Sequence, residues 1–353
     1  VYQTCMKAYV LHAINDIRLE EVPMPSPGEG EVLVEVQAVG ICGYDINRIY
    51  RTGAYSHPLI PGHEFSGVVR ETGAGADLKW QGKRVGIFPL IPCKTCGPCK
   101  KTQYELCRSY SYLGSRRDGG FAEFVRVPAD NLILLPDSVS FEAAAMMEPM
   151  AVAVHALRRV MPQKEETVAV CGLGTIGLLL VQFLLEAGIE NILVLGNKTL
   201  QEQIVESFGI PKEHYCDIRN NSPEEWLASR TSSAGVDVFF ECVGKNQVLN
   251  WAVKTTVPNG RIQLVGNPAS DLELEKNVYW KVLRNQLTIL GTWNSSFTHQ
   301  EEDDWNYVLK RLADGRIDPQ KLITHPLPFE ELETGLIMMR DKAEEYVKVM
   351  GRR

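Results

Sequence analysis

The chain has 353 residues, which at about 150 residues per domain corresponds to roughly two domains. Hydrophobic residues make up 44% and charged residues 23%, ordinary globular proportions that argue against long disordered segments. The 37 basic and 44 acidic residues give a net charge of −7, which disfavours binding to nucleic acid or to anionic membranes. No apolar stretch approaches the ~20 residues of a membrane-spanning helix, so we expect no membrane attachment.

The N-terminal residues carry little information about targeting. The first twenty residues lack the basic, apolar, small-residue order of a secretory signal, and residues 1–5 precede a plausible natural start at Met6. Four of the nine cysteines lie between Cys93 and Cys107, and in a reducing compartment such a cluster indicates metal binding rather than disulfides. We therefore expect a cytoplasmic protein.

The first part of the chain reads as a β-rich domain. Residues 7–90 alternate short β-rich runs, such as 31–36 and 67–69, with Pro and Gly. This spacing predicts a small barrel or distorted sheet rather than βαβ units. Residues 92–108 form a loop that carries the clustered cysteines, and the Ala, Met and Leu content of residues 143–160 predicts a helix.

The pattern changes near residue 160 to strands that alternate with helices, which indicates a doubly wound parallel sheet and an α/β fold. The predicted strands are 167–171, 191–195, 236–241, 261–265 and 287–290, and the predicted helices are 176–187 and 200–208. The remainder, with a helix near 301–314 and a strand near 346–350, is too short for a domain of its own. We therefore predict domains at 1–155 and 156–290, with residues 291–353 returning to the first.

A glycine-rich loop follows the first strand of this sheet and opens a helix. Gly172 permits the tight turn, Gly174 lets the backbone approach a pyrophosphate, and Gly177 lets the helix pack closely on the strand. Thr175 and Ile176 begin the helix, whose free N–H groups would face the anion. The alternative is a strand-to-helix turn that binds nothing, but the strand-loop-helix context favours a dinucleotide.

The end of the next strand bears on which nicotinamide cofactor is used. An NAD site usually has Asp or Glu there to hold the ribose 2′-hydroxyl, whereas this chain has Gly196, Asn197 and Lys198. Gly196 leaves space, and Asn197 and Lys198 offer a hydrogen bond and a charge to a 2′-phosphate. These residues favour NADP slightly, and the alternative is a surface lysine in an enzyme that uses NAD.

The clustered cysteines have the spacing of a metal site. Cys93, Cys96, Cys99 and Cys107 supply four thiolates from one loop, as a closed tetrahedral zinc site requires. The iron–sulfur run of bacterial ferredoxins has a shorter final gap followed by Pro, and here Arg108 follows a gap of seven residues. Zinc in a structural role is therefore favoured over an iron–sulfur cluster or free buried thiols.

A second set of metal-ligating residue types is dispersed along the chain. Cys42, His63, Glu64 and Glu148 together offer a thiolate, an imidazole and carboxylates, a mixed set that can leave a position open for water or substrate. Each residue alone is more often structural. Beside a dinucleotide loop, the set indicates a catalytic metal.

At this point the chain resembles the zinc-dependent medium-chain dehydrogenases. The resemblance covers essentially the whole chain in family order and is carried by residues 62–64, 93–107, 118–123, 148–149 and 172–177. It implies a GroES-like catalytic domain split around a Rossmann domain, with the active site in the cleft between them. It also implies two zinc ions per chain, one catalytic and one structural.

The resemblance assigns roles to individual residues. It implies that Cys42, His63 and Glu148 bind the catalytic zinc, with Glu64 as a neighbouring ligand that exchanges. Glu148 stands where alcohol dehydrogenases of the horse-liver type have cysteine, so the site is similar to the polyol-dehydrogenase subgroup. Tyr44 departs from the Ser or Thr that the family places in its proton relay; a phenol can serve there, or Tyr44 can simply pack in the cleft.

Further motifs resemble those of a polyol-phosphate dehydrogenase of this subgroup, acting on a substrate like galactitol 1-phosphate. They lie at residues 114–120, 281–284 and 291–293. A phosphorylated substrate needs cations near the zinc, and guanidinium groups suit phosphate. The candidates, each of which could equally be a solvated charge or a structural ion pair, are Arg48, Arg116, Arg117, Lys281 and Arg284. Free polyols such as sorbitol or iditol, and simple secondary alcohols, remain open.

The implied activity is hydride transfer between a secondary hydroxyl and a nicotinamide, with zinc as the Lewis acid. Two other classes of protein fit the sequence less well. A zinc-free reductase of the quinone-oxidoreductase kind would have no use for the two metal sets, and a zinc-ribbon module that binds nucleic acid conflicts with the acidic balance. The family resemblance implies a homodimer or homotetramer formed through the edges of the Rossmann sheet, near residues 261–290.

Overall fold

The computed structural model describes residues 4–353. Val1–Gln3 lie outside the described residues, and with them most of the segment that the sequence analysis sets aside as uninformative. The chain forms two compact units: unit 1 runs to Glu148 and resumes over Ser296–Arg353, and unit 2 is Pro149–Ser295. The sequence predicts these boundaries at residues 155 and 290. The first boundary falls inside a helix, where no change of composition marks it.

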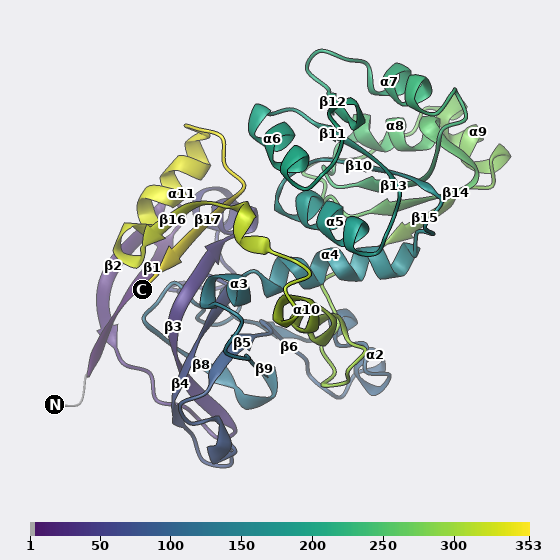
Figure 1. Ribbon diagram of the computed structural model, residues 1–353. Coiled ribbons are helices and arrows are strands. Elements are labelled where there is room, and N and C mark those ends of the chain that lie inside the picture. The colour runs from purple at the N-terminus through teal and green to yellow at the C-terminus, as the bar shows by residue number, and fades with distance from the viewer. Residues whose placement is uncertain (1–3) are drawn as a thin grey trace. The chain divides into compact units, whose positions relative to one another are not determined.

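Unit 1 is built on a mixed sheet of seven strands (Figure 1). The order is β16-β17-β3-β4-β5-β9, and β8 pairs with the first half of β3, residues 31–35, whereas β17 pairs with residues 38–41. The strands are β3 (Glu31–Ile41), β4 (Glu64–Thr72), β5 (Arg84–Ile87), β8 (Phe124–Pro128), β9 (Leu132–Leu134), β16 (Ile323–Pro328) and β17 (Lys348–Arg352). A separate hairpin joins β1 (Cys5–Ala13) to β2 (Asp16–Pro23). β17, close to the C-terminus, therefore pairs directly with the end of β3, an early strand of the chain.

The C-terminal segment is fixed to unit 1 by apolar packing as well as by strand pairing. Phe88, which follows β5, meets Phe297 and Trp305 edge to face, with ring centroids 5.4 and 5.5 Å apart. Trp305 lies on α10 (Asp304–Ala313), which begins after Asp303, whose carboxylate accepts from the Asn306 amide. The helix α11 (Leu332–Asp341) buries Leu332 and Leu336 in the core of the same unit.

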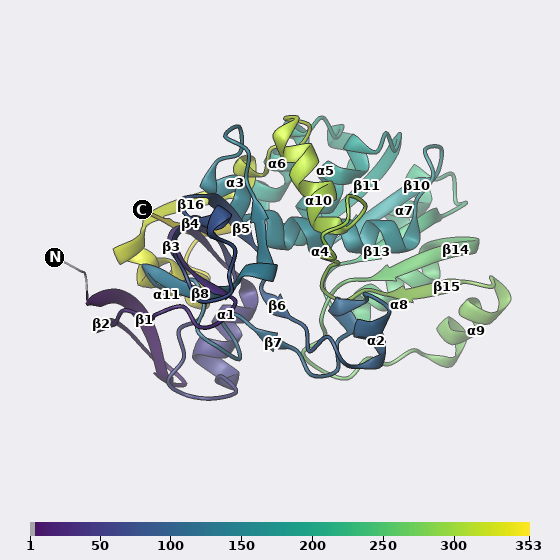
Figure 2. The same ribbon diagram turned by 90° about the horizontal axis from the view of Figure 1, so that it is seen from below.

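The cysteine loop forms a small lobe within unit 1. It contains β6 (Leu90–Ile91), α2 (Gly97–Lys100), the 3₁₀ turn Tyr104–Leu106 and β7 (Ser111–Tyr112), and β6 pairs with β7. Figure 2 shows β6, β7 and α2 together, outside the seven-stranded sheet. Two short strands thus close the base of the loop, and metal ligands can be held without a hydrophobic core.

Unit 2 is a parallel sheet of six strands in the order β12-β11-β10-β13-β14-β15. The strands are β10 (Thr167–Cys171), β11 (Asn191–Gly196), β12 (Tyr215–Asp217), β13 (Val236–Glu241), β14 (Thr256–Leu264) and β15 (Thr288–Gly291). The order reverses between β10 and β13, as in doubly wound sheets that bind dinucleotides. Helices cover both faces (Figure 1), namely α5 (Thr175–Glu186), α6 (Thr199–Ser207), α7 (Pro223–Arg230), α8 (Asn246–Thr255) and α9 (Lys276–Arg284).

The predicted helix over 143–160 is two helices, α3 (Phe141–Ala145) and α4 (Met147–Val160). Pro149 is the reason, because in a continuous helix it would lack the N–H that bonds to the Ala145 carbonyl. In the observed arrangement Pro149 lies in the first turn of α4, where that N–H is not needed. None of the described helices combines the length and the hydropathy of a membrane span.

Candidate functional site

Two neighbouring strand ends bring three metal-ligating side chains together. Cys42 follows the last residue of β3 and caps α1 (Gly43–Asn47), whereas His63 and Glu64 stand at the start of β4. The two strands are antiparallel, with Gly40 opposite Glu64, so the end of one meets the beginning of the other. The ligand atoms of Cys42, His63 and Glu64 all lie within 4.8 Å of one another. We call this set the mixed cluster.

Asp45 organises the mixed cluster from behind. Its carboxylate accepts a hydrogen bond from the Cys42 amide at 3.0 Å and forms a 3.1 Å ion pair with Arg48. The other contact is to His63, whose Nδ1 faces Asp45 Oδ1 at 3.4 Å without the geometry of a hydrogen bond. A carboxylate at Nδ1 leaves Nε2 of His63 as the nitrogen for a metal ion. Burial raises the pKa of Asp45, but His63 and Arg48 outweigh burial and leave that pKa below its ordinary value.

Lys348 supplies a buried positive charge beside the cluster. It lies on β17, is 2% exposed, and its Nζ is 2.5 Å from Glu64 Oε2 and 3.2 Å from the Ile41 carbonyl. Glu64 is itself 1% exposed, so each charge neutralises the other away from water. Burial lowers the pKa of Lys348, yet the Glu64 carboxylate more than compensates and the pKa of Lys348 is raised. Lys348 was not among the residues that the sequence predicted.

Glu148 lies near the mixed cluster but is not grouped with it among the described residues. Its Oε1 accepts a hydrogen bond from the Tyr112 hydroxyl at 3.2 Å, and the Tyr112 ring meets His63 edge to face at 5.8 Å. Burial, with the nearby Glu64 charge, raises the pKa of Glu148 to about 7. The structure thus brings Cys42 and His63 together with Glu64. Glu148 lies outside this group and is connected to His63 through Tyr112, which contacts both residues.

The donor set of the mixed cluster fits a divalent metal ion. A thiolate, an imidazole and a carboxylate that converge on one point are the mixed ligands of catalytic zinc sites. Burial raises the pKa of the Cys42 thiol, so a cation is needed to hold the thiolate form there. Tyr44 lies two residues along, on α1, with 46% of its surface exposed.

The four clustered cysteines have the geometry of a second metal site. Their sulfur atoms all lie within 4.8 Å of one another, and Cys93 to Cys99 and Cys96 to Cys107 are each 3.9 Å apart. Zinc–sulfur bonds of ~2.3 Å in a tetrahedron separate the sulfurs by about 3.8 Å, so the four positions fit zinc. Hydrogen bonds from Thr95 and the Cys96 amide lower the pKa of the Cys93 thiol to about 5.

In unit 2 the glycine loop has the three features that the sequence predicted for a pyrophosphate. Gly172 has φ +99°, which only glycine adopts readily, and a Cβ on Gly177 would lie 1.9 Å from the Gly172 carbonyl oxygen. A Cβ on Gly174 would meet no atom of residues 4–353 within 4 Å. Gly174 caps α5, where Thr175 and Ile176 begin the helix. This side of the loop is therefore open to an anion at the helix N-terminus.

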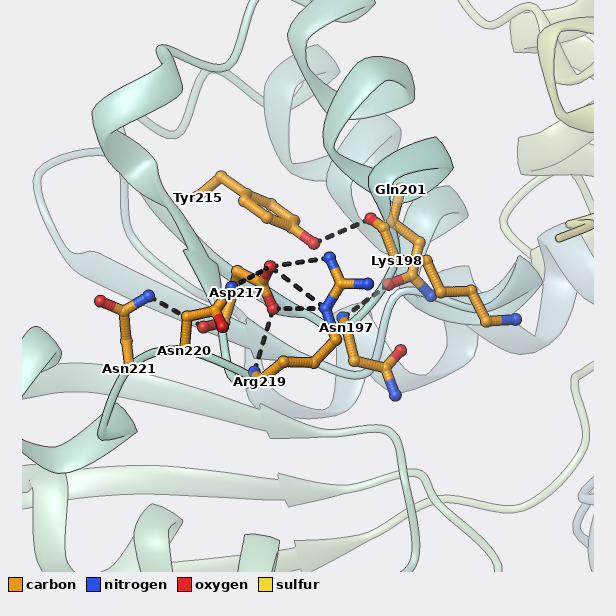
Figure 3. A network of polar contacts seen from close by, with 8 residues as sticks. All are labelled: Asn197, Lys198, Gln201, Tyr215, Asp217, Arg219, Asn220 and Asn221. Atoms are coloured by element: carbon orange, nitrogen blue, oxygen red, sulfur yellow. Dashed lines mark hydrogen bonds and ion pairs between the residues drawn. The ribbon is translucent and has the colours of Figure 1, made fainter.

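The surroundings of Gly196, at the end of β11, differ from the open space that the sequence predicts there. A Cβ on Gly196 would lie 2.7 Å from Gln201 Oε1 and 2.9 Å from the Tyr215 hydroxyl, so the expected space beside Gly196 is already filled. Gln201 Oε1 accepts from the Asn197 amide at 2.9 Å, and Tyr215 donates to the Lys198 carbonyl at 3.0 Å. Figure 3 shows these contacts around the turn. Gly196 is required for this packing rather than for empty space.

A carboxylate does stand beside this turn, but it comes from β12. Asp217 pairs in register with Gly196, and its carboxylate binds the Arg219 guanidinium through Nε and Nη2, at 2.9 and 2.7 Å (Figure 3). The Arg219 amide and Asn220 also donate to it. Asp217 is thus engaged by its own loop, and Arg219 adds a cation that the sequence analysis missed.

The five cationic candidates for substrate binding have different surroundings. Arg48 pairs with buried Asp45, and Arg117 pairs with Glu31 at 2.7 Å. Lys281 and Arg284 lie on α9 in unit 2, where Lys281 donates to the Lys254 carbonyl and Arg284 lies over the Trp280 ring. Arg116 lies in unit 1, against the rings of Tyr55 and Tyr110.

Comparison with known proteins identifies the family. The model for the alcohol dehydrogenase GroES-like domain matches residues 28–137, and the model for zinc-binding dehydrogenases matches residues 175–314. The chain therefore belongs to the zinc-binding alcohol dehydrogenases, which act on CH–OH groups, and its fold is the GroES-like domain plus Rossmann sheet that the sequence predicted.

Two of the relatives are named as dehydrogenases of a polyol or a polyol phosphate. Galactitol 1-phosphate 5-dehydrogenase of Escherichia coli is 31% identical over 92% of this chain and 94% of its own, and sorbitol dehydrogenase of Bacillus subtilis is 31% identical over 98% and 96%. The crystal structure of galactitol-1-phosphate dehydrogenase from Escherichia coli superposes with a TM-score of 0.91 at 30% identity, covering 99% of this chain and 100% of that one. The predicted resemblance to the polyol-dehydrogenase subgroup is confirmed.

Proposed function

We propose that the protein transfers hydride between a secondary hydroxyl of a polyol or polyol phosphate and NADP, with zinc held by the mixed cluster. The observation that carries the proposal is the convergence of Cys42, His63 and Glu64 at one point, in a chain of the zinc-binding dehydrogenase family. Glu148 would complete the ligand set, exchanging with Glu64, since it is buried beside His63 and bound to Tyr112. The four-cysteine lobe would hold a second, structural zinc.

Zinc bound there would lower the pKa of the substrate hydroxyl, and the nicotinamide would accept the hydride. The chain's own residues prepare the site. Asp45 fixes the imidazole of His63 and the backbone of Cys42, so both donors are oriented before a metal binds. The Lys348 ammonium forms an ion pair with Glu64 and so competes with a metal ion for this carboxylate, which favours exchange between the two glutamates. Tyr44, partly exposed on α1, would pass the substrate proton to water.

The cofactor proposal rests on charge at the end of β11. No carboxylate ends that strand, Asp217 on the neighbouring strand is bound to Arg219, and Lys198 adds a cation. A 2′-phosphate would meet cations there, whereas a ribose 2′-hydroxyl would lack the usual acid. NAD remains the alternative.

The cytoplasmic location is a prediction from the clustered cysteines, whose thiolates a reducing compartment preserves.

We also propose a homodimer, with a homotetramer built from such dimers as the larger possibility. Among residues 4–353 the edge strand β15 pairs only with β14, and exposed apolar side chains lie on it and on the preceding helix α9, namely Ile289, Tyr279, Trp280 and Leu283. A second copy of β15 related by twofold symmetry would satisfy the open edge and cover these side chains.

The test of the function is a substrate panel run with metal analysis. Free and phosphorylated hexitols and pentitols, sorbitol, L-iditol and simple secondary alcohols are offered with NAD and NADP separately. We expect two zinc ions per chain and turnover of polyols, and we expect Cys42→Ser and His63→Asn to abolish turnover while cofactor binding persists. Full activity in either variant would overturn the assignment of the mixed cluster. Faster turnover of simple secondary alcohols would replace the polyol as substrate.

A further inference from the structure

The guanidinium of Arg116 lies against two aromatic rings. The carbon of its guanidinium lies 4.2 Å from the centroid of the Tyr110 ring and 4.7 Å from that of Tyr55. Its Nη1 donates to the Tyr110 carbonyl at 2.9 Å. A ring contact takes up a face of a guanidinium, so the N–H groups that Arg116 does not use for the Tyr110 carbonyl can bind a ligand.

The charge of Arg116 is not neutralised within the described chain. Its contacts are the Tyr110 carbonyl and the two rings, and no carboxylate of residues 4–353 forms an ion pair with it. The adjacent Arg117 differs, since its guanidinium is bound to Glu31. Arg116 is also exposed to solvent, whereas Arg117 is half-buried. Of the five candidates, Arg116 alone has its cation fixed by aromatic rings within unit 1.

The turn that carries Arg116 is attached to the mixed cluster. The Arg116 amide donates to the Tyr112 carbonyl at 2.9 Å, and Tyr112 contacts both Glu148 and His63. On the other side of the turn, the Gly120 amide donates to the carbonyl of Gly62, the residue before His63, at 2.8 Å. A Cβ on Gly114 or Gly119 would collide with the Gly62 backbone, so the two segments are packed as closely as glycine allows. The rings continue from Arg116 through Tyr110 and Tyr112 to His63.

We propose that Arg116, whose guanidinium lies against the rings of Tyr55 and Tyr110, binds the phosphate of a phosphorylated polyol whose secondary hydroxyl lies at the mixed cluster. This inference rests on the proposed function and selects its phosphorylated substrate. A guanidinium edge forms paired hydrogen bonds with phosphate oxygens, and a phosphate monoester carries more negative charge than a carboxylate. A polyol without an anionic group cannot form an ion pair with Arg116.

The test compares galactitol 1-phosphate, galactitol and L-idonate with the zinc-loaded protein. Binding is measured by calorimetry in the presence of oxidised cofactor, and kcat and KM are measured separately. Arg116→Ala should weaken binding of the phosphate ester by about tenfold or more, as expected for loss of a charged hydrogen-bonded pair, with galactitol unchanged. Arg116→Lys keeps the charge without the fork and the stacking, so its affinity should be intermediate.

The matched control is Arg230→Ala, which removes another arginine stacked on a ring, over Trp226 in unit 2, and should change nothing. Equal losses for galactitol and its phosphate in Arg116→Ala, or wild-type binding that favours galactitol or L-idonate, would overturn the proposal. If no polyol is oxidised with either cofactor, the proposed function fails. Calorimetry of the ester against galactitol then still decides whether Arg116 binds phosphate.

Discussion

At the scale of single residues, the charge on Glu64 depends on a lysine from the other end of the chain. Glu64 and Lys348 are both almost completely buried and are separated by 2.5 Å. A buried ion pair costs much of its attraction in lost hydration, but removing one partner leaves the other unpaired. The pair is therefore a point where metal binding and folding are coupled.

Replacing Lys348 with Met should destabilise the metal-free protein by about 3–5 kcal/mol, since Glu64 then keeps a buried, unpaired charge. Zinc at the mixed cluster would bring a positive charge to Glu64, so we expect a smaller loss when zinc is present. Thermal unfolding in chelator and in zinc measures the difference. Lys348→Arg, which retains the cation, is the control, and equal losses in both conditions would contradict the coupling.

Two glycines of the same loop should respond oppositely to alanine. Gly177→Ala places a methyl group 1.9 Å from the Gly172 carbonyl oxygen, and such overpacking costs about 1–3 kcal/mol or more. Gly174→Ala meets no described atom within 4 Å, so stability should change by about 0.5 kcal/mol or less while NADP binding weakens. Chemical denaturation and cofactor fluorescence separate the two effects. Unchanged cofactor affinity in Gly174→Ala would show that the pyrophosphate does not approach there.

At the scale of elements, the sequence predicts the bounds of helices and strands best where the hydrophobic periodicity ends at Gly, Pro or other turn residues. The strands at 167–171 and 236–241 have the predicted bounds, and the helix after Gly174 differs by one residue at each end. In contrast, β12, α7, α8, α9 and α11 were not predicted, nor was the hairpin β1–β2. Strand β12 has only three residues, and α7 buries only Pro223 and Leu227, which is too little for an apolar face to be recognised from the sequence.

The cysteine lobe should lose one metal ion without affecting the other. Cys99→Ser removes one of four thiolates from a lobe that has little core of its own, so the zinc content should fall from two ions to one. Cys42→Ser should also leave one ion, in the lobe. Cys5→Ser, at an exposed cysteine, is the control and should keep two. Metal analysis of the purified variants decides, and two ions in Cys99→Ser would exclude the lobe as a zinc site.

The ion pair that joins the start of β10 to β14 should make stability depend on pH. Arg261 binds both oxygens of Glu166, at 3.0 and 2.6 Å. Burial raises the pKa of Glu166, but Arg261 outweighs burial and leaves it below the ordinary 4.5. A lowered carboxyl pKa stabilises the fold above the unfolded value, and this stability is lost as pH falls through the folded value.

We therefore expect Glu166→Gln to lower the free energy of unfolding by about 1 kcal/mol at pH 7. The difference from wild type should shrink as the pH falls below the ordinary pKa of 4.5 and vanish once the pH has passed the lower pKa of the folded Glu166 carboxyl. Glu165→Gln, at the exposed neighbouring residue, should match wild type throughout. Urea denaturation across this pH range tests the expectation, and a difference independent of pH would show that the pair contributes packing rather than charge.

At the scale of the whole molecule, the candidate site could be predicted as a list of residues but only partly as an arrangement. The four lobe cysteines follow from residue type and spacing, whereas Cys42 and His63 follow from residue type together with the family resemblance. The grouping of Glu64, rather than Glu148, with Cys42 and His63 depends on strand register. The contacts of Asp45, Lys348 and Tyr112 depend on segments that lie apart in the sequence. A lysine within the apolar run 347–350 was the one available signal for Lys348.

The proposed dimer should separate when its sheet edge is charged. Ile289→Arg places a cation on β15, where it opposes pairing with a second copy. Light scattering should give a mass of one chain, 39.5 kDa, for the variant and a multiple of it for wild type. Leu78→Arg, at an apolar residue 77% exposed in unit 1, is the control and should leave the mass unchanged. A measured mass of 39.5 kDa for the wild-type protein would contradict the proposed dimer.

The split of unit 1 sets an order on biosynthesis. Lys348 bonds to the carbonyl of Ile41 across 307 residues of chain, and β17 pairs with β3 over the same interval. A nascent polypeptide therefore leaves the ribosome with all of unit 2 synthesised before the sheet of unit 1 can close. Until translation reaches β17, Glu64 has no ammonium partner and β3 has an open edge, so unit 2 is free to fold first while unit 1 waits for the end of translation.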